Sequence, residues 1–348
     1  MTMTTLVTGG TGYVGGALVR ALRRRGERVR VLARKTSRTE DLVRLGVEIV
    51  TGDILDQASV EQALDGCDTL YHVAAIYEFW TPDKALLKRT AVEGTRNVLA
   101  AAQAKGIRRV IYTSTSFTIG EPRGQVGNEE TPHRGYFVHT YEEAKYRAEQ
   151  VAQDFARQGL PVVILNPAGI FGPGPLKSVG DLMLRAVTGR QPMLFRGRVS
   201  YVYIDDVVQG HLLAAEKGRP GERHILSAYN VDTADFLRET CRLAGVKPPP
   251  VGPLFVGRVV ANLQELAARL TGRPPDLPRD VVSMLAHGTW VDGSKAEREL
   301  GLRYTPLEEA IARTLDYYWQ QGWLTNKPAC LQEGVAARLE IQSGGRQR

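Results

Sequence analysis

Short apolar runs alternate with amphipathic segments through the first half of the chain. The apolar runs predict strands at residues 5–8, 29–33, 47–50, 69–73, 110–113 and 162–166. Between them, hydrophobic residues at helical spacing predict helices at residues 15–25, 38–45, 59–64, 84–105 and 141–158. Strands that alternate with helices form right-handed βαβ units, so the pattern predicts a parallel sheet covered by helices on both faces.

The pattern changes after Phe171, where Gly-Pro-Gly-Pro precedes shorter mixed elements. A further strand-and-helix unit at residues 201–216 indicates that the chain returns to the sheet. We therefore predict a doubly wound Rossmann-type α/β fold with a smaller C-terminal α/β substrate-binding domain. The predicted boundaries are 1–170 with 200–230 for the dinucleotide-binding domain, 171–199 and 231–325 for the substrate-binding domain, and 326–348 for a loose tail.

Proline-rich segments bracket a predicted helix at residues 256–270. Its apolar residues recur at helical spacing, at Val259, Val260, Leu263, Leu266 and Leu270. This pattern favours a face packed inside the second domain, and the flanking Arg258, Arg269 and Arg273 leave open a helix that lies on a membrane surface. A last amphipathic helix is predicted at residues 306–323.

Composition narrows the class of protein. With 43% hydrophobic and 24% charged residues, the chain is typical of a globular protein, and it has no apolar run of the length, about 18 residues, that a membrane span needs. The first residues show no secretion signal, and the three cysteines lie far apart, so we expect a cytoplasmic protein with reduced thiols and no metal site. The net charge of +7 is dispersed, which suits an anionic cofactor and gives no nucleic-acid-binding stripe.

A glycine-rich turn joins the first predicted strand to the first predicted helix. Gly9, Gly12 and Gly15 recur every three residues in the segment TGGTGYVGG. Glycine lets a backbone turn tightly and approach a pyrophosphate, whose charge the N–H groups of a helix N-terminus stabilise. The turn is a candidate dinucleotide-binding loop, although a flexible surface turn would contain the same glycines.

Tyr141 and Lys145 lie four residues apart in a predicted helix, so their side chains share one face. A lysine ammonium beside a phenol lowers the phenol's pKa from about 10, which would let Tyr141 exchange a proton near neutral pH. Thr115 and Ser116 follow the strand at 110–113, where a hydroxyl could bond a substrate oxygen. A casual contact on an exposed helix and a self-capping polar loop are the alternatives.

Together these motifs resemble the extended short-chain dehydrogenase/reductase family of NAD-dependent epimerases and dehydratases. The resemblance continues in GD at 52–53, HVAA at 72–75, YTSTS at 112–116, NPAGIFGPG at 166–174 and YVYIDDV at 201–207. It covers residues 4–320. The segments IYEFWTPD, GERHIL and SKAERELG are most similar to the branch of dihydroflavonol reductases and hopanoid-associated sugar epimerases.

The resemblance implies roles for individual residues. Tyr141 would be the acid/base, Lys145 would hold the nicotinamide ribose and tune Tyr141, and Thr115 stands where the family usually has a catalytic serine, with Ser116 as the alternative. The expected cofactor contacts are Gly9, Thr11, Gly12, Tyr13 and Gly15 at the glycine turn, Asp53 and Ile54 at the adenine, Ala74 and Ala75 at the ribose, and Pro167 and Ile170 behind the nicotinamide.

The end of the second predicted strand indicates which cofactor is preferred. NAD sites usually carry an acidic residue there that binds the ribose 2′-hydroxyl, but this chain has Arg34, Lys35 and Arg38. Because arginine suits a phosphate through paired donors, we expect NADP rather than NAD, unless these side chains are merely solvated.

The expected activity is that of an NADP-dependent oxidoreductase that interconverts a carbonyl compound and its alcohol. A sugar epimerase or dehydratase and a non-enzymatic NADP sensor are the alternatives. Sugar epimerases of the family place an arginine where this chain has Val199, and Arg196 and Arg198 lie out of register. Four aromatic residues could line a pocket for an apolar small molecule, namely Tyr77, Phe79, Trp80 and Phe137. The resemblance also suggests a homodimer.

Overall fold

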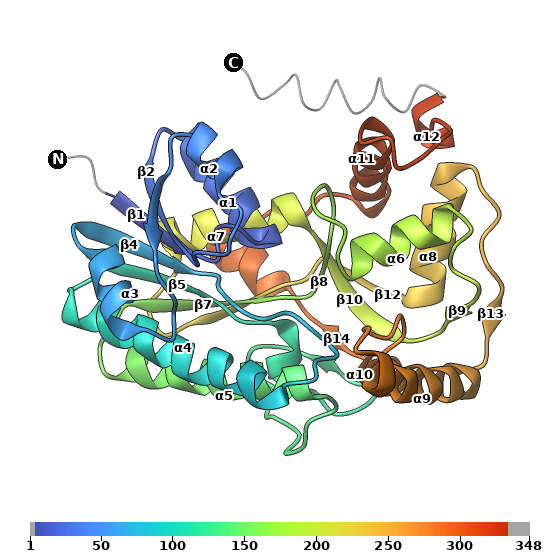
Figure 1. Ribbon diagram of the computed structural model, residues 1–348, viewed down its shortest axis with the longest axis horizontal. Helices are drawn as coiled ribbons and strands as arrows, with labels where there is room; N and C mark the ends of the chain where they lie inside the picture. The colour runs from blue at the N-terminus through green and yellow to red at the C-terminus, as the bar shows by residue number, and fades with distance from the viewer. Residues whose placement is uncertain (1–3, 333–348) are drawn as a thin grey trace.

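A seven-stranded parallel sheet forms the larger part of the molecule (Figure 1). The structure is a computed structural model and describes residues 4–332. The strand order β3-β2-β1-β4-β5-β7-β11 reverses direction between β1 and β4 and confirms the predicted Rossmann-type fold. The strands are β1 (Thr4–Thr8), β2 (Arg28–Ala33), β3 (Glu48–Thr51), β4 (Cys67–His72), β5 (Arg109–Thr113), β7 (Val162–Pro167) and β11 (Arg223–Leu226).

Helices cover both faces of this sheet, because successive strand residues point to opposite sides and both sides are apolar. On one face, Val7, Val31 and Ile111 pack with α1, α2 and α7. On the other face, Leu6 and Leu70 pack with α3, α4 and α5. These helices are α1 (Tyr13–Arg24), α2 (Glu40–Arg44), α3 (Gln57–Leu64), α4 (Lys84–Ala104), α5 (Thr140–Arg157) and α7 (Ile204–Lys217). The elements predicted in the first half all form, with ends within two residues of the expected positions.

The second part of the molecule, on the right in Figure 1, contains small sheets and the remaining helices. β10 pairs in parallel with β8 and antiparallel with β12, while β13 pairs with β9 and β14 with β6. The strands are β6 (Val126–Gly127), β8 (Gly169–Phe171), β9 (Leu194–Phe195), β10 (Arg198–Tyr203), β12 (Tyr229–Asp232), β13 (Val251–Gly252) and β14 (Trp290–Val291). The helices are α6 (Val179–Val187), α8 (Thr233–Ala244), α9 (Leu254–Thr271), α10 (Arg279–His287), α11 (Leu307–Gln320) and α12 (Ala329–Gln332), with short turns η1 (Ser116–Ile119) and η2 (Ala296–Leu300).

The hydrophobic core on the α1 face of the sheet meets the core of the second part at α1 and β8. Val14, Ala17 and Ile170 border both the core on the α1 face of the sheet and the core of the second part. Ala296 and Leu300 of η2 also belong to the core on the α1 face, although they lie in the chain between α10 and α11 of the second part. The chain thus passes more than once between the two parts, and the domain boundaries stay a prediction.

Helix α9 corrects an expectation from the sequence. Its stripe of Val259, Leu263, Leu266 and Leu270 is exposed, so the predicted packed face is wrong. The side that is buried carries small residues instead, namely Gly257, Ala261 and Ala268. None of the helices within residues 4–332 has the length and apolar character needed to cross a membrane.

The C-terminal region also differs from the expectation where it is described. Residues 329–332 of the predicted loose tail form α12, because Cys330 is buried against the core of the second part. The rest of that segment, residues 333–348, lies outside the described residues.

Candidate active site

The turn between β1 and α1 leaves no room for side chains at its glycines. Gly9 has a left-handed φ of +74°, and a Cβ on it would lie 2.7 Å from the Cα of Ala74. A Cβ on Gly15 would lie 2.1 Å from the carbonyl oxygen of Gly9. Gly12 precedes α1 without a side-chain cap, so the first N–H groups of the helix are available to an anion. This cradle fits the pyrophosphate of a dinucleotide.

The other residues predicted to contact the cofactor follow strands at the same edge of the sheet. Arg34 and Lys35 follow β2 and are exposed, and Thr11 is exposed at the glycine turn. Further along this edge lie Asp53 and Ile54 after β3, Ala74 and Ala75 after β4, and Pro167 at the end of β7, while Ile170 lies three residues later in β8 of the smaller sheet. The carboxyl ends of parallel strands form the ligand-binding edge of such sheets. The structure therefore brings these residues together, and their contacts with a cofactor stay a prediction.

The side chain of Tyr13 makes a contact within the protein that the sequence did not predict. Its hydroxyl donates a hydrogen bond of 3.0 Å to the carbonyl oxygen of Gly172. A Cβ on Gly174 would lie 2.4 Å from the Tyr13 ring, so this ring lies directly against the segment that enters the second part. The side chain of Tyr13 thus holds the glycine turn to that segment.

Tyr141 is buried in the first turn of α5, and its hydroxyl shares a hydrogen bond with the side chain of Thr115. Burial raises the pKa of Tyr141 well above its ordinary value, the nearby Tyr77 and Tyr112 add to this, and the bond with Thr115 opposes it. Tyr141 is therefore protonated at neutral pH. Thr115, rather than the alternative Ser116, is the residue hydrogen-bonded to Tyr141.

Lys145 lies one turn further along α5 and points toward β5. Its Nζ donates to the carbonyl oxygen of Thr113 at 2.9 Å and to the Tyr112 hydroxyl at 3.4 Å. Burial lowers the pKa of Lys145 to about 8, against the opposing charge of Glu149. The expectation that Lys145 lowers the pKa of Tyr141 is wrong for this structure, because burial outweighs it and the ammonium is bonded to other oxygens.

Aromatic side chains surround the Tyr141 ring. Its ring centroid lies 5.2 Å from that of Tyr77, 6.0 Å from Phe79 and 6.3 Å from Phe117 and His139. The Nδ1 atom of His139 accepts the N–H of Glu142 and caps α5, and burial lowers the pKa of His139 to about 3. The aromatic wall around the Tyr141 hydroxyl is thus uncharged.

Two of the four aromatic residues predicted to line a pocket lie elsewhere or show no contact there. Phe137 packs against His133 and Tyr146 instead of the Tyr141 ring, because the loop before α5 turns it toward that helix. Trp80 is half-buried. Tyr77 and Phe79, in contrast, both contact the Tyr141 ring.

A small pocket lies beside this wall, and it has an apolar and a polar side. Phe117, Val138, His139, Met284 and Thr289 line it together with Glu121, Arg134 and Glu142. Arg134 and Glu142 form a buried ion pair. Burial raises the pKa of Glu121 to about 7, and its Oε1 is buried without a hydrogen-bond partner.

A family model described as the NAD dependent epimerase/dehydratase family matches residues 5–231. The chain belongs to this family. A protein of Synechocystis sp. named "Putative dihydroflavonol 4-reductase" is 36% identical over 328 residues, which cover 91% of this chain and 95% of the relative. A 2-alkyl-3-oxoalkanoate reductase of Stenotrophomonas maltophilia is 33% identical over 330 residues, which cover 89% of this chain and 98% of the relative.

Solved structures agree with this membership. A nucleoside-diphosphate-sugar epimerase from Pseudomonas aeruginosa superimposes with a TM-score of 0.76 at 26% identity, covering 93% of this chain and 100% of that one. As a member of the epimerase/dehydratase family, the protein is an enzyme of the extended short-chain dehydrogenase/reductase type with an NAD(P) cofactor and a small-molecule substrate.

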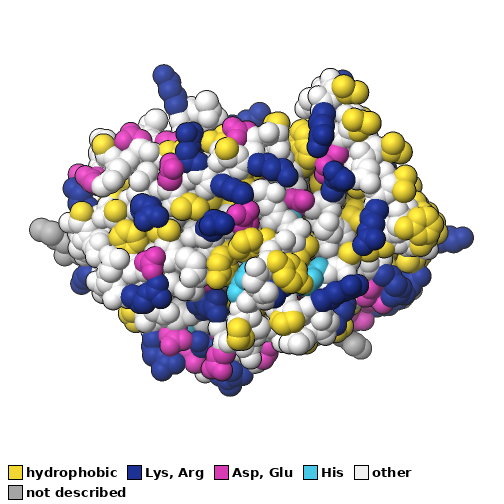
Figure 2. Space-filling view, turned by 90° about the horizontal axis from the view of Figure 1, so that it is seen from below, with side chains coloured by type: hydrophobic (Ala, Val, Ile, Leu, Met, Phe, Trp, Pro, Cys, Tyr) yellow, Lys and Arg dark blue, Asp and Glu magenta, His cyan; other side chains and the backbone are white. Residues whose placement is uncertain are grey.

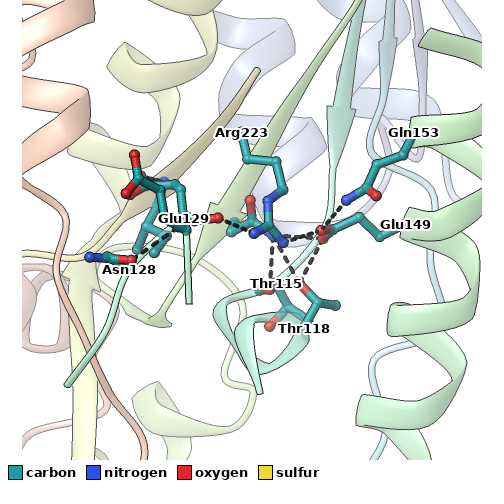
Figure 3. A network of polar contacts seen from close by, with 10 residues as sticks. Thr115, Thr118, Asn128, Glu129, Glu149, Gln153 and Arg223 are labelled. Carbon is teal, nitrogen blue, oxygen red and sulfur yellow. Dashed lines mark hydrogen bonds and ion pairs between the residues drawn. The ribbon is translucent and has the colours of Figure 1, made fainter. Parts of the chain in front are cut away.

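A buried carboxylate holds the turn next to Tyr141 in place, and the sequence did not predict it. Glu149 of α5 accepts hydrogen bonds from Asn166 at 2.7 Å and Thr118 at 2.6 Å, and pairs with Arg223 at 3.0 Å. Asn166 also donates to the carbonyl oxygen of Thr115. Figure 3 shows the Glu149 carboxylate in contact with Arg223 and with Thr118, on the turn that also carries Thr115. Helical spacing gave a signal, because Glu149 follows Tyr141 and Lys145 by four-residue steps.

A second missed cluster lies under the glycine turn. His72 at the end of β4 contacts the Thr8 hydroxyl through Nδ1 at 2.8 Å and the Thr95 hydroxyl through Nε2 at 3.3 Å. The Thr8 hydroxyl in turn accepts the N–H of Ala74. Burial lowers the pKa of His72 to about 3, so this cluster is neutral and fixes the ends of β1 and β4 next to each other.

Proposed function

We propose that this enzyme is an NADP(H)-dependent oxidoreductase that interconverts an apolar carbonyl compound and its alcohol. The observation that carries the proposal is the protonated Tyr141 hydroxyl, bonded to Thr115 within a wall of aromatic rings. A phenol that keeps its proton at neutral pH is in the form that protonates a carbonyl oxygen during reduction. The uncharged wall favours an apolar substrate over a charged one.

Different residues of the chain have separate roles around the carbonyl oxygen of the substrate. When bound, NADPH supplies the hydride. Thr115 hydrogen-bonds the carbonyl oxygen, and Tyr141 transfers its phenolic proton to that oxygen. Lys145, with a pKa of about 8, is mostly charged at neutral pH, and its ammonium would hold the nicotinamide ribose, as the family resemblance implies. The aromatic wall excludes water, which strengthens these interactions.

The two arginines at the start of β10 give little support to the alternative function, a sugar epimerase. Arg196 is paired with Asp232 and Asp235. Arg198 donates to the carbonyl oxygen of Gly124 and lies 3.8 Å above the Trp290 ring. Both guanidinium groups already have partners, which argues against a clamp for the diphosphate of a nucleotide sugar.

A panel of apolar ketones and aldehydes, read by NADPH consumption, tests the proposal. We expect at least one of them to be reduced, and Tyr141→Phe to lower kcat at least 100-fold, the lower end of what a general acid contributes. Tyr146→Phe on the same helix is the matched control and should keep its activity. Full turnover by Tyr141→Phe, or conversion of a sugar without any net change of the cofactor, would contradict the oxidoreductase mechanism.

The preference for NADP is supported by Arg34 and Lys35, which are exposed directly after β2. A guanidinium there can bind a ribose 2′-phosphate with two parallel donors. We expect Arg34→Ala to weaken NADP binding about tenfold, the effect of losing one charge-assisted contact, and to leave NAD binding unchanged. Arg24→Ala, an exposed arginine at the far end of α1, is the control. Equal affinity of the wild type for NAD and NADP would rule the preference out.

A homodimer, which the family resemblance suggests, stays a prediction. Light scattering of the purified enzyme would test it.

A further inference from the structure

Helix α9 carries an apolar stripe that faces solvent along its whole length. Its members follow one another at steps of four, four, three and four residues, and they are Phe255, Val259, Leu263, Leu266 and Leu270. These side chains are between 54% and 82% exposed. Scattered apolar side chains are ordinary on a protein surface, but a continuous stripe of five large ones marks an interaction site.

The opposite side of α9 already contacts the protein. Gly257, Ala261 and Ala268 are buried there, and α9 packs against α10. Glu265 and Gln264 accept backbone N–H groups of Arg279 and Leu277, which fasten the helix to the segment that follows it. The stripe is therefore held outward and cannot be buried by rotation of the helix.

Cationic side chains border the stripe. Arg258 and Arg269 are exposed on one flank of α9, and Arg273 follows its C-terminal end. Within residues 4–332, no hydrogen bond or ion pair engages the guanidinium groups of these three arginines. Figure 2 views the side on which α9 and α10 lie in Figure 1, and its right-hand part shows hydrophobic side chains interspersed with lysine and arginine.

We propose that α9 docks on the surface of an anionic lipid bilayer, with its axis in the plane of the membrane. An apolar stripe buries itself at the boundary between headgroups and acyl chains, while arginines beside it contact anionic headgroups. At about 1.5 Å per residue, the 18 residues of α9 give a contact about 27 Å long. This docking does not depend on the proposed oxidoreductase activity.

A second copy of the chain fits the stripe less well. Two α9 helices that paired through this stripe would bring Arg258, Arg269 and Arg273 of one copy near the same arginines of the other. Like charges at an interface oppose association. Anionic headgroups complement the same charges, so the bordering arginines favour the lipid surface.

Co-sedimentation of the full chain with vesicles tests the docking. We expect binding to phosphatidylcholine vesicles that contain phosphatidylglycerol, and at least about tenfold weaker binding to vesicles of phosphatidylcholine alone. Leu263→Glu/Leu266→Glu and Arg258→Glu/Arg269→Glu should each lower the binding at least about tenfold. Val43→Glu/Val126→Glu changes two equally exposed apolar residues elsewhere, 58% and 51% exposed, and should bind as the wild type does.

The positions changed are on the surface, so all variants should keep the circular dichroism spectrum and unfolding temperature of the wild type. Equal sedimentation with both kinds of vesicle, or equal sedimentation of all variants, would overturn the proposal. A dimer that Leu263→Glu/Leu266→Glu converts to monomer, without vesicle binding by the wild type, would overturn it in favour of self-association.

Discussion

Burial sets the charge of the residues around Tyr141. It raises the pKa of the Tyr141 phenol and lowers the pKa of His139 to about 3 and of Lys145 to about 8. Each shift favours the neutral form, because a low-dielectric surrounding penalises charge. Of these three residues, Lys145 keeps its charge for the most part at neutral pH, so an ammonium lies one helical turn from a protonated phenol.

Glu121 should make the stability of the protein depend on pH. Burial raises the pKa of its carboxyl from 4.5 to about 7, so between these values the folded protein keeps a proton that the unfolded chain releases. Stability therefore falls as pH rises through this window, by about 3 kcal/mol in total. We expect Glu121→Gln to lose this fall, as measured by urea unfolding near pH 5 and pH 8. Wild type and variant with the same pH dependence would show that Glu121 titrates normally.

At the scale of elements, three side chains on one face of α5 connect the parts of the site. Tyr141 contacts Thr115 at η1, Lys145 contacts β5, and Glu149 contacts β7 and β11. The three side chains follow one another by four residues, so they lie in a row along the helix. A single helix thus sets the distances between the Tyr141 phenol, the Lys145 ammonium and the turn that carries Thr115.

Removing the carboxylate of Glu149 should destabilise the fold. Glu149→Ala would leave Arg223 without its buried partner and Asn166 and Thr118 without an acceptor, a loss of about 3 kcal/mol in urea unfolding. Glu143→Ala is the matched control, because Glu143 on the same helix makes more exposed ion pairs with Lys88 and Arg147. We expect that control to lose less than about 1 kcal/mol. Equal losses for the two variants would contradict the role given to Glu149.

The pattern of apolar residues was enough to predict the sheet and the Tyr141 helix, because periodicity reports which residues are buried together. It could not tell which side of α9 meets the protein, since small residues pack there and the large apolar ones face solvent. The same helical spacing could have predicted that Glu149 shares the face of Tyr141. It could not predict the partner of Glu149, because Arg223 comes from a strand 74 residues further along the chain.

At the scale of the whole molecule, apolar contacts and hydrogen bonds join the two parts. Val14, Ala17 and Ile170 border both cores. Asp206 at the start of α7 accepts two hydrogen bonds from Thr305, which leads into α11 of the second part.

We therefore expect one cooperative unfolding transition. Far-UV circular dichroism reports the helices and strands, while tryptophan fluorescence reports Trp80 between β4 and α4, Trp290 in β14, Trp319 at the end of α11, and Trp323 just beyond it. The two signals should give the same midpoint in urea, and NADP should raise both midpoints equally. Separate midpoints would show that the second part unfolds on its own.

The crowding at the glycine turn limits how this enzyme can evolve. Any side chain at Gly15 meets the backbone of Gly9, and any side chain at Gly9 meets the backbone of Ala74, so no repacking of neighbouring side chains can relieve either substitution. Mutation is tolerated poorly at these positions even when a compensating change arises nearby. Arg34 and Lys35, by contrast, are solvent-exposed. Substitutions are thus free to accumulate at the end of β2, while the glycine turn stays unchanged.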